Sequence, residues 1–471
     1  MAEHTQVAVL GGGPGGYAAA FRAADLGLEV TLVDLEEKPG GVCLYRGCIP
    51  SKALLHVSKL IQEAEEAAAI GVSFGAPDIN LDRVREWKEE VVQQMVGGLA
   101  QLSRRRNVRY IQGRGEFQNS QSLLINTADG EQVLEYDHAI LATGSRPATI
   151  PPLEVDSERV LNSRTALNLP DTPKKLLVIG GGYIGLELGQ VYSSLGTEVS
   201  VVEMMPSLLP GVDKDLVKPL SQRIEDTFED VILKSKVVEM KEQKNGMKVT
   251  IEEEGGERNN RIFDKVLVAI GREPVSEDLG LENTKVQLDE NGFVRVDQQR
   301  RTGDPAIFAI GDIAGEPMLA HKASHEGLVA AETIAGEKVA FEPYAIPAVV
   351  FTDPEVAWAG LTESRAEEED IEYETARFPW AASGRATTLA RADGLTKLLV
   401  DPESERILGV GITGPNAGEL IAEGVLAIEM GATAADLALT IHPHPTLSET
   451  LMEAAEAFYG QSIHIYRPKR K

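Results

Sequence analysis

The amino-acid sequence predicts an α/β fold in which a strand, glycine turn, helix and strand unit occurs twice and a C-terminal α+β domain follows. Two glycine-rich turns support this prediction, at residues 11–16 and 180–185, each between an apolar strand and an apolar helix. The third observation is a change of pattern after residue 344, where short strands and helical stretches appear without a glycine-rich turn.

The first unit begins with the apolar strand 7–10, and the turn GGGPGG at 11–16 fits the pattern G-x-G-x-x-G. A helix at 17–26 and a strand at 29–33 follow, and Asp34 ends that strand. Glycines at such a turn let the backbone approach a pyrophosphate at a helix N-terminus, and the acid accepts hydrogen bonds from a ribose diol. This context predicts a dinucleotide-binding unit of Rossmann type.

The second unit repeats this order with strand 176–179, turn 180–185, helix 186–195 and strand 198–202, and it ends at Glu203. We expect two nucleotide sites in two similar domains; the alternative is one true site and one structural copy. A carboxylate at this position would accept hydrogen bonds from a free 2′-hydroxyl and repel a 2′-phosphate. The residues directly after it contain no Arg or Lys, so NAD is expected rather than NADP.

The chain of 471 residues has two cysteines, Cys43 and Cys48, in the pattern C-x4-C. Two cysteines are too few for a disulfide scaffold. A zinc site would need about four ligands, and no second cysteine pair or nearby histidine pair completes one, so no metal is expected. We interpret the pair as a redox dithiol.

Composition excludes several classes of function. A net charge of −27 would repel a nucleic acid. No apolar run reaches the roughly 18 residues of a membrane span. The first residues lack the basic and apolar regions of a signal peptide, so a cytoplasmic location is expected.

Three further apolar strands, at 139–147, 266–274 and 306–312, each run into a glycine turn. The first two are expected to be the last strands of the two nucleotide-binding domains. Asp312, at the end of the third strand, either grips a polyol chain or caps a turn. Helices are expected at 52–69, 81–105 and 318–335.

After residue 344 the pattern is that of antiparallel strands followed by helices. This region carries His442 and His444, each followed by a proline, which holds the segment extended and points the two side chains to opposite sides. We expect one of them at most to face a given site, and a lone histidine is more often structural. The expected strands are 349–351, 375–378, 395–400 and 407–412, and the expected helices are 418–430, 434–439 and 447–459.

Further motifs join these features in chain order: Gly40-Gly41-x-Cys43-x4-Cys48-x-Pro50, Ala142-Thr143-Gly144, Gly311-Asp312 and His444-Pro445-Thr446-x-x-Glu449. With them, the chain resembles the flavin-linked pyridine nucleotide disulfide oxidoreductases along essentially its whole length. Segments at 356–363, 378–386 and 444–447 are similar to those of the branch of this family that oxidises dihydrolipoamide. One departure is Tyr45-Arg46 between the cysteines, where that branch more often carries Asn-Val.

The resemblance implies FAD on the first unit and NAD on the second. FAD is implied on Gly11, Gly13, Gly16 and Asp34, with Lys52 near the isoalloxazine, Asp312 on the ribityl chain, and Gly115, Thr143, Gly144 and Ala320 lining the same site. NAD is implied on Gly180, Gly182, Ile184, Gly185 and Glu203, with Val237, Gly271 and Arg272 around it and Tyr183 and Glu187 on the nicotinamide side of the flavin.

A dithiol cannot pass a hydride directly to a nicotinamide, whereas a flavin accepts electrons from a thiolate and releases a hydride, so the order is sulfur, flavin, nicotinamide. The resemblance implies that Cys43 forms a mixed disulfide with the substrate and that Cys48 lies against the flavin. It also implies a base, His444 with Glu449 behind it, supplied by the other subunit of a homodimer. The expected activity is oxidation of dihydrolipoyl groups on a carrier protein, through a Cys43–Cys48 disulfide and FAD, with reduction of NAD.

The expected domains are an FAD-binding domain with the disulfide (1–148), an NAD-binding domain (149–274), a central domain completing the FAD site (275–343) and an interface domain (344–471). The alternatives are a glutathione or mercuric reductase, an NADH oxidase, and a docking subunit without activity. Glu203 disfavours the first, since those enzymes usually use NADPH, and the paired cysteines disfavour the second. The carrier stays open: the acyltransferase of a 2-oxo acid dehydrogenase complex, the glycine-cleavage carrier or another lipoylated protein.

Overall fold

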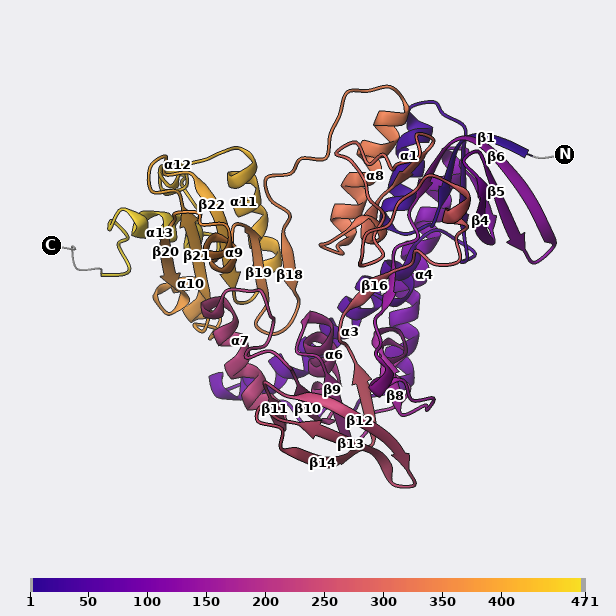
Figure 1. Ribbon diagram of the computed structural model, residues 1–471. Coiled ribbons are helices and arrows are strands. Elements are labelled where there is room, and N and C mark those ends of the chain that lie inside the picture. Colours follow the sequence, from indigo (N-terminus) through magenta and orange to yellow (C-terminus); the bar gives the residue numbers. More distant parts are fainter. Residues whose placement is uncertain (1–2, 467–471) are drawn as a thin grey trace.

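The computed structural model describes residues 3–466 and has three regions, two of them at opposite ends of the molecule (Figure 1). The N-terminal region and the C-terminal region are these two ends, and the middle of the chain forms the third region between them. Within the described residues, no helix has the length and apolar character needed to cross a membrane.

The first region contains a sheet in which both dinucleotide-unit strands are parallel neighbours. Residues 7–10 of its central strand are continuously apolar because both faces are covered there, and Val7, Ala8 and Val9 have no exposed surface. Helix α1 (Pro14–Asp25) packs against α8 (Ala320–Ile334), far along the chain. The sheet has the order β3 (Arg109–Gln112), β2 (Val30–Asp34), β1 (Glu3–Leu10), β6 (Gly130–Leu141), β5 (Ser122–Thr127), β4 (Arg114–Asn119), with β17 (Ile307–Ala309) pairing parallel with β6.

The second region repeats the parallel arrangement on a smaller scale. Helix α6 (Tyr183–Ser194) follows the first strand of its unit, as α1 does in the first region. The parallel sheet has the order β11 (Asp230–Ile232), β10 (Glu198–Val202), β9 (Lys175–Ile179), β15 (Lys265–Val268), β8 (Val160–Asn162). Beside it lie an antiparallel sheet of β12 (Lys236–Gln243), β13 (Gly246–Glu252) and β14 (Arg258–Phe263), and a ribbon of β7 (Ser145–Pro147) and β16 (Arg272–Pro274).

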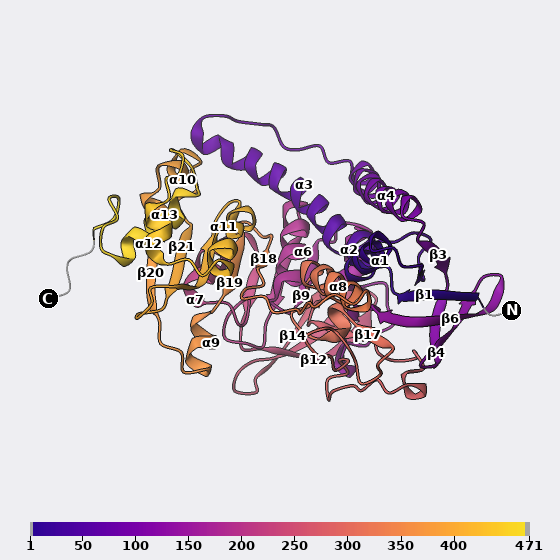
Figure 2. The ribbon, with the colours of Figure 1, turned by 90° about the horizontal axis from the view of Figure 1, so that it is seen from above.

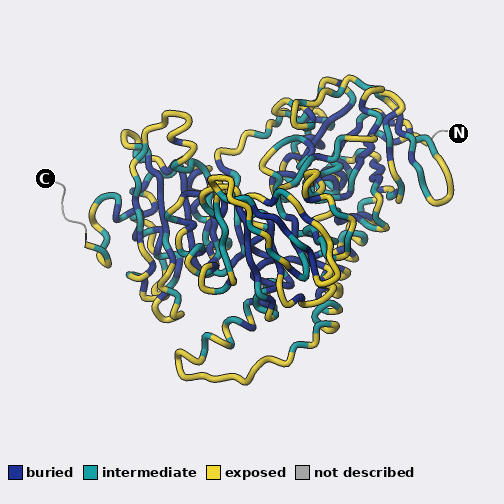
Figure 3. The backbone as a smooth tube through the Cα atoms, turned by 60° about the horizontal axis from the view of Figure 1, so that its bottom comes forward, coloured by how far each residue is buried: buried dark blue, intermediate teal, exposed yellow. Residues whose placement is uncertain are grey.

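Two long helices follow the cysteine segment. The cysteines lie on α2 (Gly41–Arg46) and at the start of α3 (Cys48–Glu66). Helix α3 runs from the first region toward the C-terminal region (Figure 2), and α4 (Leu81–Arg105) follows it. The segment between them, with the short η1 (Ala67–Ile70), is largely exposed (Figure 3).

The C-terminal region is an antiparallel sheet with helices, as the sequence predicted. Trp380 has no exposed surface, and Phe378 has 1% of its surface exposed, so the sheet has its own core. The sheet has the order β18 (Ala348–Val350), β19 (Val356–Gly360), β22 (Ile407–Thr413), β21 (Leu395–Val400), β20 (Glu374–Pro379). The helices are α9 (Glu363–Glu368), α10 (Gly384–Thr388), α11 (Ala417–Glu429), α12 (Ala434–Leu439) and α13 (Glu449–Phe458).

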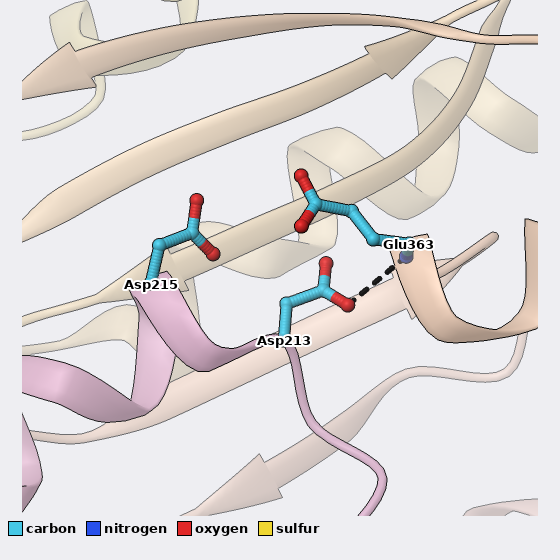
Figure 4. Close-up of side chains that lie close together, drawn as sticks. All are labelled: Asp213, Asp215 and Glu363. Atoms are coloured by element: carbon cyan, nitrogen blue, oxygen red, sulfur yellow. Dashed lines mark hydrogen bonds between the residues drawn. The ribbon is translucent and has the colours of Figure 1, made fainter. Parts of the chain in front are cut away.

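An ion-pair network joins the second region to the C-terminal sheet. Asp213 and Asp215 at the start of α7 (Lys214–Thr227) face Glu363 of α9 (Figure 4). The Nζ atom of Lys397, whose side chain is fully buried, lies 2.6 Å from a carboxylate oxygen of each aspartate. Arg377 pairs with Asp215 at 2.6 Å and with Glu363 at 2.7 Å. Because two cations, Lys397 and Arg377, already pair with these three carboxylates, we interpret the cluster as an interdomain clamp rather than a metal site.

Candidate functional site

A cavity of about 340 Å³ lies where the first glycine turn, the cysteine helices and helix α6 meet. Cys43 and Cys48 both line it. Of the residues expected around FAD, those that line it are Gly11, Gly13, Asp34, Lys52, Gly115, Thr143, Gly144, Asp312 and Ala320.

The first glycine turn has the backbone that a bound pyrophosphate requires. A Cβ on Gly11, where φ is +108°, would overlap the carbonyl oxygen of Ala142. A Cβ on Gly16, which is buried, would overlap the carbonyl oxygen of Gly11. Gly13 has open space on its Cβ side, at the N-terminus of α1. Bare backbone therefore faces the cavity at a helix N-terminus, which fits the diphosphate of FAD.

Asp34 closes this turn from the end of β2. Its Oδ2 accepts a hydrogen bond from the Gly12 amide, and its Oδ1 accepts one from the Glu36 amide at 2.8 Å. Burial raises the pKa of Asp34, and these two hydrogen bonds oppose the rise. The carboxylate is thus held in place at the edge of the cavity.

The second glycine turn reproduces this geometry. A Cβ on Gly180, where φ is +107°, would overlap the carbonyl oxygen of Ala269, and one on Gly185 would overlap that of Gly180. Glu203 accepts hydrogen bonds from the Gly181 amide at 2.7 Å and from the Met205 amide at 2.7 Å. Gly182 is open, as Gly13 is. The sequence repeat is therefore also a structural repeat.

The residues expected around NAD divide between two places. Tyr183, Ile184, Glu187 and Arg272 line the same cavity as the first unit. Val237 is 6% exposed and packs in the core beneath the second sheet, so its side chain has little surface to offer a ligand. The remaining ones are outside the lining of this cavity: Gly180, Gly182, Gly185, Glu203 and Gly271.

The cysteines are free thiols, which corresponds to the reduced state of the pair. Cys48 is the first residue of α3, where the helix dipole favours a thiolate. A hydrogen bond with Cys43 lowers the pKa of Cys48 to about 7, against the opposing effect of burial, and Lys52 lowers it further. The same hydrogen bond, together with burial, raises the pKa of Cys43. The two sulfurs are therefore unequal, and Cys48 is the one that loses its proton first.

Lys52 and Glu187 form an ion pair beside the cysteines. The Lys52 Nζ lies 2.8 Å from Glu187 Oε2 and 4.4 Å from the ring centroid of Phe351. Glu187 is buried and also accepts hydrogen bonds from the Ser51 hydroxyl at 3.0 Å and the Phe351 amide at 2.9 Å. The Glu187 carboxylate thus connects α6 with α3 and with the segment after β18, beside the cysteines.

Ser145 forms hydrogen bonds with both Asp312 and Arg272, two predicted site residues for which the sequence indicated no mutual contact. Its hydroxyl donates to Asp312 and accepts from Arg272 Nε at 2.8 Å, and its carbonyl accepts from the other end of the same guanidinium at 2.7 Å. Arg272 therefore lies at the boundary of the two nucleotide-binding regions. Thr143 donates to the Val275 carbonyl at 2.7 Å. The one sequence signal for Ser145 is its place directly after Ala142-Thr143-Gly144.

The two histidines near the C-terminus have different surroundings. The His442 side chain is 5% exposed, and both ring nitrogens are engaged, Nδ1 with the Thr440 carbonyl at 2.8 Å and Nε2 with Glu423 at 2.6 Å. The His444 side chain is 71% exposed, and its Nδ1 lies 2.8 Å from Glu449 Oε1. His442 is held as a structural residue, whereas His444 presents an imidazole oriented by a carboxylate.

His444 does not reach the cysteines of its own chain. Among the described residues, those lining the cysteine cavity fall between positions 10 and 323, and none comes from the C-terminal region. In Figure 2, α13, which begins at Glu449, lies near one end of the molecule, whereas α2 lies beside α1 on the far side of α6. One chain therefore holds both halves of the predicted thiol site but keeps them apart.

Comparisons with known proteins agree with this arrangement. Residues 5–327 match the pyridine nucleotide-disulphide oxidoreductase model, and residues 346–455 match the dimerisation domain of the same group. The chain belongs to the pyridine nucleotide-disulphide oxidoreductase family. Membership confirms the predicted fold class, with two Rossmann-like units and a C-terminal dimerisation domain, and the dimerisation domain supports a homodimer.

Individual members of the family match over nearly the whole chain. Dihydrolipoyl dehydrogenase of Vibrio cholerae is 49% identical over 99% of this chain and 98% of its own, and that of Haloferax volcanii is 45% identical over 98% of each. The structure of LpdA from Mycobacterium tuberculosis aligns with a TM-score of 0.89 at 28% identity, over 96% of this chain and 99% of that one. The flavoprotein disulfide reductase RclA from Escherichia coli aligns at 0.86 and 26% identity, over 97% and 99%. The cofactors of this family member are FAD and NAD.

Proposed function

We propose that this protein oxidises dihydrolipoyl groups and reduces NAD, the activity for which its relatives are named. The observation that carries the proposal is the unequal pair of sulfurs in the cavity of the first glycine turn, with Cys48 the thiolate. A dihydrolipoyl group is a dithiol, and a protein disulfide is its natural oxidant by thiol–disulfide exchange.

The sulfur chemistry follows from this inequality. In the oxidised state, a substrate thiolate attacks Cys43 Sγ, a bond forms between the two sulfurs, and Cys48 leaves as a thiolate. A pKa of about 7 for Cys48 makes it a good leaving group. The second substrate thiolate then attacks the first substrate sulfur, releases the cyclic disulfide and leaves Cys43 reduced. Two electrons and two protons have left the substrate, and the electrons are held by the reduced Cys43 and Cys48 pair. FAD bound in this cavity would accept them from the cysteines and would supply the hydride chemistry that reduces NAD.

We assign the base to His444, with Glu449 behind it, supplied by the partner subunit of a homodimer. A substrate thiol with a pKa of roughly 8.5 needs such a base, and an imidazole of pKa about 6.5 suits it. The exposure of His444 and its separation from the cysteine cavity of its own chain support the assignment. Exposed apolar side chains on the same region also favour a covered surface: Leu426, Met430, Leu439 and Ile441.

We propose roles for the other site residues as the sequence predicted them. Asp34 would accept hydrogen bonds from the FAD ribose and Glu203 from the NAD ribose, and the lack of Arg or Lys directly after Glu203 favours NAD. The limits 1–148, 149–274, 275–343 and 344–471 are proposed as domains. The partner is a lipoylated carrier, and a cytoplasmic location stays a prediction.

One set of assays tests the activity. The purified protein should carry flavin absorbance and should reduce NAD with dihydrolipoamide. Glutathione disulfide with NADH or NADPH is the matched alternative substrate. A colourless protein, or one that turns over glutathione disulfide with NADPH and not dihydrolipoamide with NAD, contradicts the proposal. Capture of binding partners from a lysate, probed with an antibody against lipoyl-lysine, then identifies the carrier.

A further inference from the structure

The segment between β2 and the cysteine helix is folded back against the first glycine turn. The Gly40 amide donates to the Gly12 carbonyl at 2.8 Å, and a Cβ on Gly41, where φ is +58°, would overlap the Gly13 Cα. Asp34, at the other end of the segment, accepts from the Gly12 amide. The cysteine helix therefore starts in contact with the backbone that would hold the cofactor diphosphate.

The residues between the cysteines make a second connection to this segment. Arg46, at the end of α2, forms an ion pair with Glu36, and both side chains are about three-quarters buried, with 24% and 26% exposed. The Tyr45 hydroxyl donates to the Lys38 carbonyl at 3.1 Å. The Glu36 carbonyl in turn accepts from the Tyr110 hydroxyl at 2.8 Å. Tyr45 and Arg46 thus bind the disulfide helix to the loop that follows the ribose acid.

This connection lies in the wall of the cofactor cavity. Asp34, Glu36 and Arg46 all line the cavity, as do both cysteines. Without Arg46, the carboxylates of Asp34 and Glu36 would lie unpaired with a cation at the place where a dinucleotide must bind. Its diphosphate is negatively charged and would be repelled. The other cations lining the cavity have different partners: Lys52 pairs with Glu187, Arg272 bonds Ser145, and Arg114 lies near Glu116 and Asp278.

We infer that the Arg46–Glu36 ion pair, supported by Tyr45, couples FAD binding at the first glycine turn to the position of the redox cysteines. Arg46 is a positioning residue in this role: it neutralises Glu36 and holds α2 against the loop. The inference rests on FAD occupying this cavity, as the proposed function requires. It gives Tyr45 and Arg46, which stand between the cysteines where related chains more often carry Asn-Val, a function in retaining FAD.

The test measures FAD directly. We expect Arg46→Met to speed FAD release by about five- to tenfold, a modest factor because the pair is partly exposed to solvent. Glu36→Gln breaks the same pair but also removes a carboxylate from the cavity wall, so it should speed release by less. The double variant should release FAD no faster than Arg46→Met alone, because the two residues act as one unit. Tyr45→Phe should have a smaller effect in the same direction. Arg365→Met, which removes an exposed Arg–Glu pair on α9, is the matched control and should change nothing.

A second measurement separates coupling from a merely structural role. FAD should raise the Tm of wild-type protein, and this rise should shrink in Arg46→Met while the Tm of the FAD-free form changes little. FAD binding should also change the alkylation rate of Cys43 in wild type and change it less in Arg46→Met.

The inference would be overturned by unchanged FAD release, by additive effects of the two substitutions, or by an equal fall in Tm with and without FAD. Slower release in Glu36→Gln would also overturn it, since Arg46 would then act on the cofactor alone. Failure of wild-type protein to oxidise dihydrolipoamide would instead refute the proposed activity, and it leaves these FAD measurements interpretable.

Discussion

The two glycine turns of this chain have the same local geometry but different surroundings. In both, the first and last glycines pack where a Cβ would overlap a carbonyl oxygen, and the acid accepts a hydrogen bond from the second glycine. The first turn opens into a cavity shared with two cysteines, a lysine and the β7–β16 ribbon. The second contributes to that cavity through the helix that follows it, by Tyr183, Ile184 and Glu187.

The difference shows that the turn alone does not choose the cofactor. The glycines give both units a backbone geometry that fits a diphosphate, whereas the neighbouring elements decide which reactive group lies beside it. Helix α3 brings a thiolate and a lysine to the first unit, and the buried Glu187 of the second unit contacts that lysine. The two units are therefore joined directly beside the two cysteines.

The substitution with the largest expected effect should stop the thiol reaction of the first unit and leave the nicotinamide reaction of the second unit. Cys48→Ser should abolish dihydrolipoamide oxidation, because the serine oxygen cannot form the disulfide that the substrate attacks. The NAD side keeps its binding residues, so NADH-dependent reduction of an artificial dye by the flavin should continue. Both rates are measured on protein of matched flavin content. Persistent dihydrolipoamide oxidation would show that the thiol pair is misassigned.

The substitution with the second-largest expected effect tests whether oxidation of the dithiol needs a residue that lies outside both nucleotide-binding units. His444→Ala should slow dihydrolipoamide oxidation by about 10²–10⁴, the usual worth of a positioned proton-transfer group. Steady-state kinetics with dihydrolipoamide measure it. The control is His442→Ala, which removes a buried, fully bonded ring and should lower thermal stability more than the turnover of folded protein. A near-normal rate in His444→Ala would refute the assignment of the base.

Matched glycine substitutions test the equivalence of the turns. Gly16→Ala should release FAD, because the new methyl group overlaps the Gly11 carbonyl and displaces the turn. Gly185→Ala should keep FAD but raise KM for NAD by about tenfold or more. Flavin content and NAD kinetics of the two variants give the comparison. Loss of FAD from the Gly185 variant alone would reverse the assignment of the units.

The smallest expected effect concerns the ionisation of the Cys48 thiol beside the first unit. In reduced protein the alkylation rate of Cys48 should rise with pH around a midpoint of about 7, since the thiolate is the reactive form above it. Cys43→Ala should move the midpoint up toward the usual value of roughly 8.5, and Lys52→Met should move it up by less, because the Cys43 hydrogen bond is the largest cause. A larger shift from Lys52→Met would show that the lysine controls the thiolate.

The parts of the fold that the sequence predicted well are those with a strong periodic signal. The expected helix at 81–105 coincides with α4, and the expected 434–439 coincides with α12. The antiparallel strands β12 to β14 were not predicted, although Met247, Val249 and Ile251 of β13 alternate with polar residues and are buried. Strands β4 and β5 were also missed, and β5 has three apolar residues in succession, at 123–125, instead of an alternating pattern.

The site residues also divide into those that the sequence predicted and those that it did not. Glycine turns and the C-x4-C pair are local, so spacing along the chain reveals them. Ser145 and the Lys52–Glu187 ion pair depend on contacts between residues far apart in sequence, and no local pattern marks such a contact. The resemblance supplied Asp312, Lys52 and Arg272 as site residues, but it did not supply their hydrogen-bond partners.

The sequence by itself determined the two glycine turns, the C-x4-C pair and the acid at the end of each unit, because each depends on residue type at a fixed local spacing. The preference of Glu203 for an unphosphorylated ribose stays a prediction from that spacing. The tertiary structure decided which sulfur carries the charge and which histidine is available. Those properties arise from a hydrogen bond, a helix N-terminus and the burial of a ring. It also gave Tyr45 and Arg46 partners in the loop after β2, contacts that exist once the chain has folded back on its own glycine turn.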